Sequence, residues 1–129
     1  MILDTTFLVD VLRGDAVVRD AIEIVDEQDH VSVSTVTVME LWDGVRRVAT
    51  SEREREATIR LLSEIREVPF DGASARVAGD VAARLAANGT PIESTDVMIA
   101  ATAIARDVPV VTRNVDHFER VEELSVLTY

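Results

Sequence analysis

The sequence contains no cysteine, which excludes a disulfide framework, a thiolate metal site and a cysteine nucleophile. It also lacks any apolar run close to the roughly 18 residues that a membrane-spanning helix requires. The start of the chain has neither the basic residues nor the cleavage site of a signal peptide. We therefore expect a cytoplasmic protein without a membrane anchor.

Lysine is absent as well: arginine supplies all 13 basic residues, against 24 acidic ones, and the net charge is -11. A P-loop requires a lysine on the phosphates. Receiver domains and haloacid-dehalogenase-type phosphatases ordinarily need one too, so all three α/β classes are disfavoured. The acidic surface indicates a halophilic host with a salty cytoplasm. A GC-rich genome would explain the missing lysine, but not the acidity.

The apolar pattern predicts one α/β domain over residues 1–129. Short β-branched runs alternate with longer amphipathic segments, which is typical of a parallel sheet covered by helices. We expect strands at 1–3, 30–33, 68–70, 109–112 and 124–128. Helices are expected at 5–14, 15–28, 35–48, 51–66, 72–89 and 95–107, with a helical turn at 115–121.

Most acids lie on predicted solvated helix faces, Asp10 and Asp20 among them, but three stand beside or inside apolar sequence. Asp4 ends the first strand, Glu40 lies within VTVMELW, and Asp96 begins the most apolar helix. Each has a structural alternative. Asp4 could cap the next helix, Glu40 could pair with an arginine of its own helix, and Asp96 could interact with the helix dipole.

A fourth polar site is VVTRNVDHF at 110–118, where a strand is followed by Asn114 and Asp116. An ordinary polar turn has the same composition. However, loops after parallel strands gather at one sheet edge, so this segment should approach Asp4 there. Converging carboxylates raise each other's pKa unless a cation neutralises them. Oxygen ligands favour Mg²⁺ or Mn²⁺, and such a site suits phosphodiester hydrolysis.

Four stretches together resemble a PIN-domain nuclease, and more closely the VapC-type toxins of prokaryotic toxin–antitoxin pairs. They are MILDTTFLVD, TVTVMELWDGV, ESTDVMIAATAIARDVPVVTRNVDHF and the closing LSVLTY. The resemblance implies a PIN-like three-layer α/β/α fold with a central parallel sheet of about five strands. It also implies a Mg²⁺- or Mn²⁺-dependent endoribonuclease that forms a homodimer. Its partner would be a small antitoxin whose C-terminal segment lies along the active-site groove.

The resemblance assigns roles by position. Asp4, Glu40 and Asp96 match the metal-binding acids of the family. Thr6 matches the small hydroxyl residue after the first aspartate, where it would bond the acid or a metal-bound water. Thr112 matches the threonine that ends the fourth strand.

The fourth acid departs from the family pattern. Some members have an aspartate where Asn114 stands, and many have another where His117 stands. We expect Asp116 to be the fourth carboxylate, with Asn114 orienting water or phosphate. Arg113 is a candidate for attracting RNA to this acidic protein. Further candidates are Arg13, Arg46 and Arg47.

Two other functions remain open. The chain could be a PIN nuclease for RNA processing that has no antitoxin, although its compact length favours the toxin type. It could also be a catalytically weak module retained for antitoxin or operator binding. The three intact acids oppose that alternative, whereas Asn114 favours it.

Overall fold

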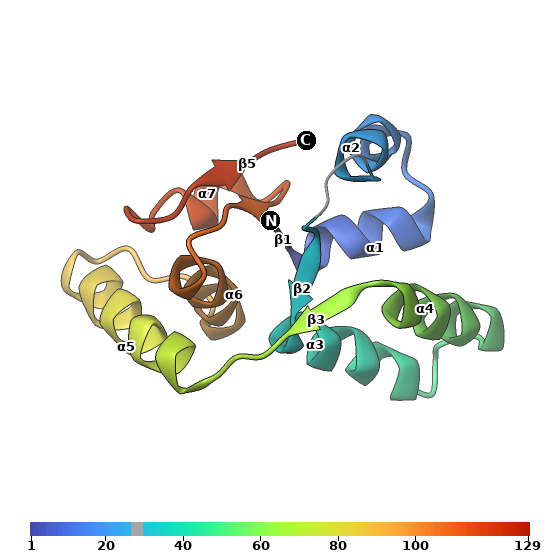
Figure 1. The fold of residues 1–129 in the computed structure, drawn as a ribbon. Helices are drawn as coiled ribbons and strands as arrows, with labels where there is room; N and C mark the ends of the chain where they lie inside the picture. Colours follow the sequence, from blue (N-terminus) through green and yellow to red (C-terminus); the bar gives the residue numbers. More distant parts are fainter. Residues whose placement is uncertain (27–29) are drawn as a thin grey trace.

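The computed structural model describes residues 1–26 and 30–129 (Figure 1). Within them, five strands form one parallel sheet with the order β3-β2-β1-β4-β5. The strands are β1 (Ile2–Leu3), β2 (Ser32–Ser34), β3 (Arg66–Val68), β4 (Val110–Val111) and β5 (Val126–Leu127). The expected α/β class with a five-stranded parallel sheet is confirmed.

The helices lie close to the segments predicted from the sequence. They are α1 (Thr5–Arg13), α2 (Ala16–Asp26), α3 (Thr35–Arg46), α4 (Glu52–Glu64), α5 (Gly72–Ala87), α6 (Ser94–Ala105) and α7 (Val115–Phe118). The Ser34 hydroxyl caps α3, and Ser51 with Glu54 forms a capping box on α4. Gly14 ends α1 with φ 70°, a left-handed conformation that favours glycine. The expected end of the second helix, at 27–28, lies outside the described residues.

The sheet separates two apolar cores, because neighbouring side chains of a strand point to opposite faces. Ile2 and Val110 pack in a core with residues of α5 and α6, whereas Leu3 and Val111 pack with residues of α1, α2 and α4. Figure 1 shows these helices on the two sides of the sheet. This arrangement confirms the three-layer fold.

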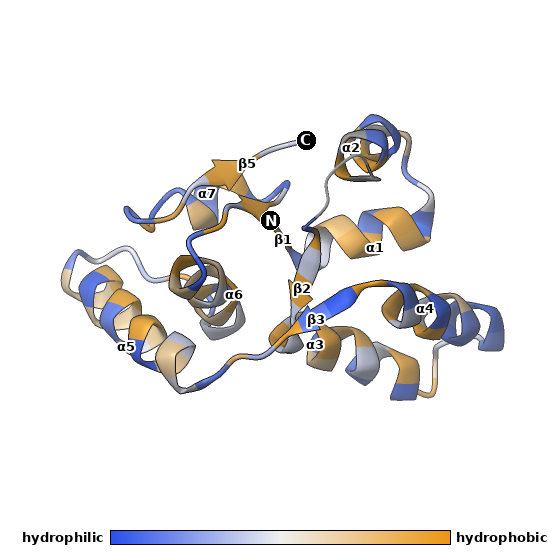
Figure 2. Ribbon diagram, in the orientation of Figure 1, coloured by the Kyte–Doolittle hydropathy of each residue, from blue (hydrophilic) through white to orange (hydrophobic). Residues whose placement is uncertain are grey.

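Strand β3 differs from the prediction, which placed it at 68–70. The ladder to β2 uses Arg66, Glu67 and Val68, and the strand ends before Pro69, which has no N–H to donate. The first two residues of this edge strand, Arg66 and Glu67, are charged and exposed. Figure 2 colours this part of the strand as hydrophilic. A search for apolar runs misses such a strand, although charge on an edge protects it from unwanted pairing.

The strand order positions the functional site. The chain runs from β1 through β2 to β3 on one side, and β4 and β5 lie on the other, so the order reverses between β1 and β4. In open parallel sheets, ligands bind at such a point, outside the carboxyl ends of the strands. The N–H of Asp4 donates to the carbonyl of Val111 over 2.9 Å, which brings the two strand ends together. Among the described residues, no helix is long and apolar enough to cross a membrane.

Candidate active site

An open cavity of about 280 Å³ lies at the carboxyl ends of β1 and β4. Five acids line it: Asp4, Asp10, Glu40, Glu93 and Asp96. The other polar side chains of its lining are Thr5, Thr6, Arg13, Arg113, Asn114 and His117. The acids come from the end of β1 and from α1, α3 and the start of α6, so the fold gathers carboxylates that are far apart in sequence.

Asp4 is held by hydroxyl groups. The residue is 1% exposed, and its Oδ2 accepts hydrogen bonds of 2.8 Å from both Thr6 and Thr112. Asp4 stands at the N-cap position of α1, but its side chain makes no capping bond there, which counts against the capping alternative. Within the described residues, Oδ1 accepts no hydrogen bond and remains available to a ligand.

Glu40 projects from α3 and is held by the Thr5 hydroxyl, which donates to Oε1 over 2.7 Å. Partial burial raises the pKa of Glu40 above its usual range, the Thr5 bond opposes this shift, and the charges of Asp4 and Asp96 add to it. The alternative partner Arg47, which follows α3 directly, does not neutralise this glutamate: it pairs with Asp43 at 3.0 Å.

Asp96 lies in the first turn of α6, close to His117 of α7. The Nδ1 atom of His117 is 3.1 Å from Asp96 Oδ2 and 2.8 Å from Asn114 Nδ2. Protonated at Nδ1, the ring donates to Asp96; unprotonated there, it accepts from Asn114. Burial raises the pKa of Asp96, the hydrogen bond from His117 opposes the shift, and the charge of Asp4 adds to it.

The structure brings Asp4, Glu40 and Asp96 together, but it does not bring Asp116 to them. Asp116 is exposed and does not line the cavity, whereas its neighbour His117 does. Of the four arginines expected to attract RNA, two lie at the cavity and two do not. Arg13 and Arg113 line the cavity, while Arg47 pairs on the helix surface and Arg46 covers the ring of Trp42 at 5.6 Å.

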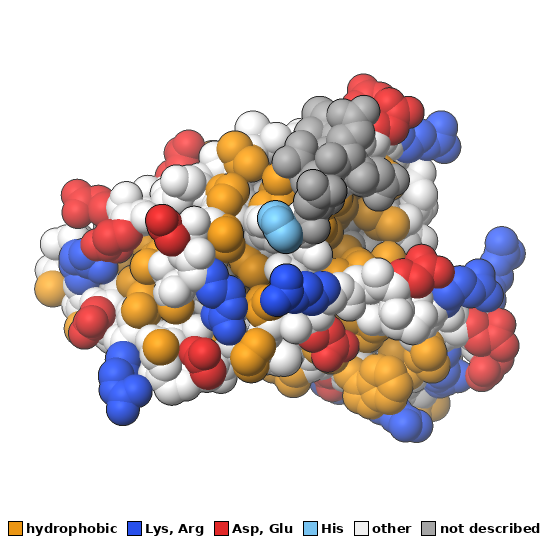
Figure 3. Space-filling model, viewed as in Figure 1, with side chains coloured by type: hydrophobic (Ala, Val, Ile, Leu, Met, Phe, Trp, Pro, Cys, Tyr) orange, Lys and Arg blue, Asp and Glu red, His pale blue; other side chains and the backbone are white. Residues whose placement is uncertain are grey.

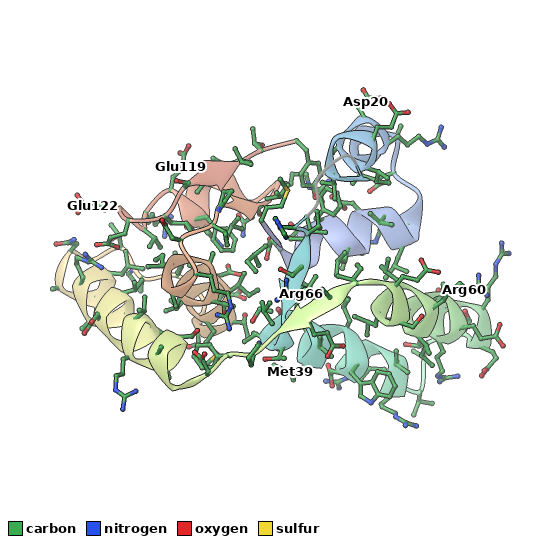
Figure 4. The ribbon with its side chains drawn as sticks, viewed as in Figure 1. Asp20, Met39, Arg60, Arg66, Glu119 and Glu122 are labelled. Atoms are coloured by element: carbon green, nitrogen blue, oxygen red, sulfur yellow. The ribbon has the colours of Figure 1, made fainter. Side chains whose placement is uncertain are left out.

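Asp10 was expected on the surface, and this is wrong. It is 1% exposed, accepts a 2.7 Å hydrogen bond from the Tyr129 hydroxyl and lies 3.2 Å from Arg113. By contrast, Asp20 is exposed on α2, as Figure 4 shows. The sequence does contain a sign of this burial. Asp10 follows the buried Phe7 by three residues and therefore lies on the apolar face of its helix.

The side chains of the site offer oxygen donors, the type of ligand that hard divalent cations prefer. No ion pair joins Asp4, Glu40 or Glu93 to an arginine within the described residues, and the available ligands are oxygens. In the same part of the chain, no three His, Asp or Glu side chains are close enough to hold a metal together. A divalent ion would therefore be held by at most two of these side chains, and water would complete its coordination.

The sheet order and the acidic cavity at its switch point define an α/β protein with a candidate ligand site, and comparison with known families identifies its class. Residues 1–124 match the PIN domain model. The chain therefore belongs to the PIN-domain family.

Known relatives narrow the group within that family. The chain is 33% identical to the tRNA(fMet)-specific endonuclease VapC of Shigella flexneri over 120 residues, 92% of this chain and 89% of that protein. It is also 33% identical to Ribonuclease VapC10 of Mycobacterium tuberculosis over 124 residues, 96% and 90% of the two chains. Among solved structures, VapBC-5 of M. tuberculosis, a member of the VapBC family of toxin–antitoxin systems, matches with a TM-score of 0.78 and 28% identity, covering 99% and 97% of the two chains.

Proposed function

We propose that this chain is the toxin of a toxin–antitoxin pair and hydrolyses RNA phosphodiester bonds with the help of Mg²⁺ or Mn²⁺. Its PIN domain and its VapC ribonuclease relatives make it an RNA-hydrolysing nuclease. The observation that supports the chemistry best is the cavity at the switch point. There Asp4, Glu40 and Asp96 converge from distant segments, and no arginine of the described chain neutralises them.

Each acid is held by its own neighbour. Asp4 is fixed through Oδ2, so Oδ1 is the atom directed to a ligand. Glu40 is anchored by Thr5, and its raised pKa suits it to accept a proton from the attacking water. A divalent ion bound here would supply activated water and stabilise charge on the scissile phosphate.

The fourth position is polar but carries no carboxylate in the cavity. We propose that Asn114 and His117 take the place expected of Asp116, because both line the cavity and Asp116 does not. Asn114 can orient water or phosphate through hydrogen bonds. His117 positions Asp96.

The partners follow from the same relatives. The match to VapBC-5 supports a cognate antitoxin. We further propose a homodimer that works in the cytoplasm; sedimentation of the free chain should give twice its mass of 14.2 kDa. The Shigella relative is named for tRNA(fMet), which makes that tRNA the first substrate to test. A short neighbouring gene for a DNA-binding antitoxin would separate a toxin from an RNA-processing nuclease.

The decisive experiment is RNA cleavage by the chain purified without antitoxin. We expect cleavage with Mg²⁺ or Mn²⁺ and none with EDTA. Asp96→Asn should reduce the rate by about 10²–10³, the usual effect of losing one electrostatic contributor in an active site. Asp20→Asn removes an exposed acid and is the matched control. Cleavage in EDTA, or full activity of Asp96→Asn, would overturn the proposal. Asp116→Asn should stay active; its inactivity would make Asp116 the fourth acid.

The acidic, lysine-free composition also supports a halophilic host. In that case the fold should be more stable in molar KCl than in dilute buffer, because salt screens the repulsion among carboxylates. Equal free energies of unfolding in the two buffers would count against this origin.

A further inference from the structure

Asp10 is a buried acid at the edge of the cavity and has no part in the proposed chemistry. Its Oδ2 accepts the hydrogen bond from Tyr129, and its Oδ1 is fully buried without a hydrogen-bond partner in the described chain. The nearest cation is the guanidinium of Arg113, whose Nη2 is 3.2 Å from Oδ1. Burying a carboxylate costs free energy unless the group is paired. The burial of Asp10 beside Arg113 therefore calls for a role that an acid on the protein surface would not have.

Tyr129 fixes the position of Asp10. Its ring packs edge-on against Phe7 of α1 with centroids 5.0 Å apart, and its hydroxyl donates to Asp10 over 2.7 Å. Burial, followed by the bond to Asp10, raises the pKa of Tyr129 above its ordinary value, so the phenol keeps its proton near neutral pH. Tyr129 follows β5 by two residues and Arg113 follows β4 by two residues. Since β4 and β5 pair in parallel, the sheet brings both residues to the same edge.

Arg113 leaves its donors available. Its side chain is 51% exposed and lines the cavity beside the carboxylates. It donates no hydrogen bond within the described residues, since its contact with Asp10 is an ion pair without hydrogen-bond geometry. A guanidinium carries five N–H donors in a fixed fork that matches phosphate. Arg113 is therefore held in place by the charge of Asp10, while the N–H groups that do not face this carboxylate stay available.

Such an arginine matters on this acidic protein. On the face shown in Figure 3, arginine and acidic side chains are interspersed over α4 and α5, so the described part of that face has no broad basic surface. The whole chain carries a net charge of -11, which repels RNA. An arginine beside the acids of the cavity, such as Arg113, can provide a phosphate contact in spite of this overall charge.

We infer that Asp10 and Tyr129 are positioning residues that hold Arg113 at the rim of the cavity, where it binds a phosphate of the RNA next to the scissile one. The inference rests on the proposed ribonuclease function. Anchoring the long side chain to a buried acid removes much of the entropy that its ordering would cost on binding. Asp10 never touches RNA; it acts through Arg113.

The test compares cleavage kinetics of Arg113→Ala, Arg113→Lys, Asp10→Asn and Tyr129→Phe with those of wild type. Arg113→Ala should raise KM about tenfold, the effect of one charge-assisted hydrogen bond, with little change in kcat. Arg113→Lys should recover part of that loss. Asp10→Asn should raise KM several-fold and Tyr129→Phe by less. The double variant Asp10→Asn/Arg113→Ala should match Arg113→Ala alone, because Asp10 acts only through the arginine.

If Asp10 and Arg113 only stabilise the fold and do not bind RNA, the result is different. Asp10→Asn would then lower the melting temperature and leave KM unchanged, which overturns the inference. Arg60→Ala, which removes an exposed arginine of α4 (Figure 4), controls for the loss of general charge and should leave KM unchanged. If Asp10→Asn fails to fold, Tyr129→Phe and the exposed Arg113 variants still decide the question.

A second readout separates this inference from the nuclease proposal. Binding of a fluorescent 20-nucleotide RNA is measured in EDTA at several salt concentrations. Arg113→Ala should reduce the slope of log K against log salt by about 0.7, the value for one lost contact to a single strand. An unchanged slope overturns the role of Arg113. A wild-type chain that binds RNA but never cuts it overturns the nuclease proposal alone, and one that does neither overturns both.

Discussion

The cavity has two unlike sides, each built around an aspartate that is 1% exposed. On the carboxylate side, Asp4 is joined by Glu40 and Asp96. On the arginine side, Asp10 is joined by Tyr129 and Arg113. The first side gathers negative charge without an arginine from the described chain, whereas the second contains its own cation. The burial of an acid is therefore a weak indication of its function, and the charge of the groups around it is a stronger one.

The hydrogen bonds of the two aspartates sharpen the contrast. Asp4 receives two hydroxyl bonds on one oxygen, which fix its orientation without cancelling its charge. Asp10 receives one hydroxyl bond and the charge of a guanidinium. Under the proposed function, we expect a bound cation to balance the charge on the carboxylate side, whereas Asp10 on the arginine side already has a cation beside it. Three measurements can break or sharpen this comparison.

The largest expected effect is stabilisation by a divalent ion. Mg²⁺ or Mn²⁺ at about 100 times its Kd should raise the free energy of unfolding by about 2.7 kcal/mol, because the ion binds only the folded state. Urea unfolding with and without the ion measures the gain. Asp96→Asn should lose most of it, and Asp10→Asn should keep it. A response that vanishes in Asp10→Asn but survives in Asp96→Asn would place the cation on the arginine side.

A smaller effect should follow from removing the hydroxyl that serves each aspartate. Thr112 is fully buried; its hydroxyl donates to Asp4 and accepts from the Asn114 N–H over 2.9 Å. Thr112→Val should therefore cost about 1–3 kcal/mol, because it strands buried polar groups. Tyr129→Phe should cost about 1 kcal/mol or less, because Arg113 still pairs with Asp10 and the ring still packs on Phe7. Urea midpoints with an unchanged slope measure both, and equal losses would contradict the comparison.

Much of the fold was predictable because its signals are local. Alternating apolar runs gave the strands, and caps such as Ser34 and Ser51 marked helix starts. The edge strand was misplaced because its residues are polar, and its identity comes from pairing with β2. Pairing between distant segments leaves little trace in a short stretch of sequence.

The site was predictable to the extent that acids stand out against apolar neighbours. Glu40 and Asp96 do so, and the structure brings both to the cavity with Asp4. The burial of Asp10 was not predicted, because its partners Tyr129 and Arg113 lie more than 100 residues away in the sequence. The choice between Asp116 and His117 depends on one step of rotation in a short helix, which sequence alone does not determine.

The smallest effect concerns the protonation of the carboxylate side. Burial and like charges raise the pKa of Glu40 above its ordinary value of 4.5, so the folded state holds this proton more tightly than the unfolded chain does. The contribution of Glu40 to stability is then complete at low pH and is lost as pH rises through the raised pKa. Without metal, Glu40→Gln should stabilise the fold at neutral pH by about 0.5 kcal/mol, a small gain because the group is half-buried and screened.

The gain from Glu40→Gln should fade below the ordinary pKa of glutamate, where wild type is neutral as well. Asp71 provides a control of opposite sign. Its pKa is lowered mainly by the N–H of Ser74 at the start of α5, so Asp71→Asn should lose stability at neutral pH and approach wild type in acid. Urea unfolding in EDTA across pH 3.5–7.5 measures both. If Glu40→Gln is less stable than wild type at neutral pH, the ionised Glu40 is stabilised within the protein, and the carboxylate side needs no external cation.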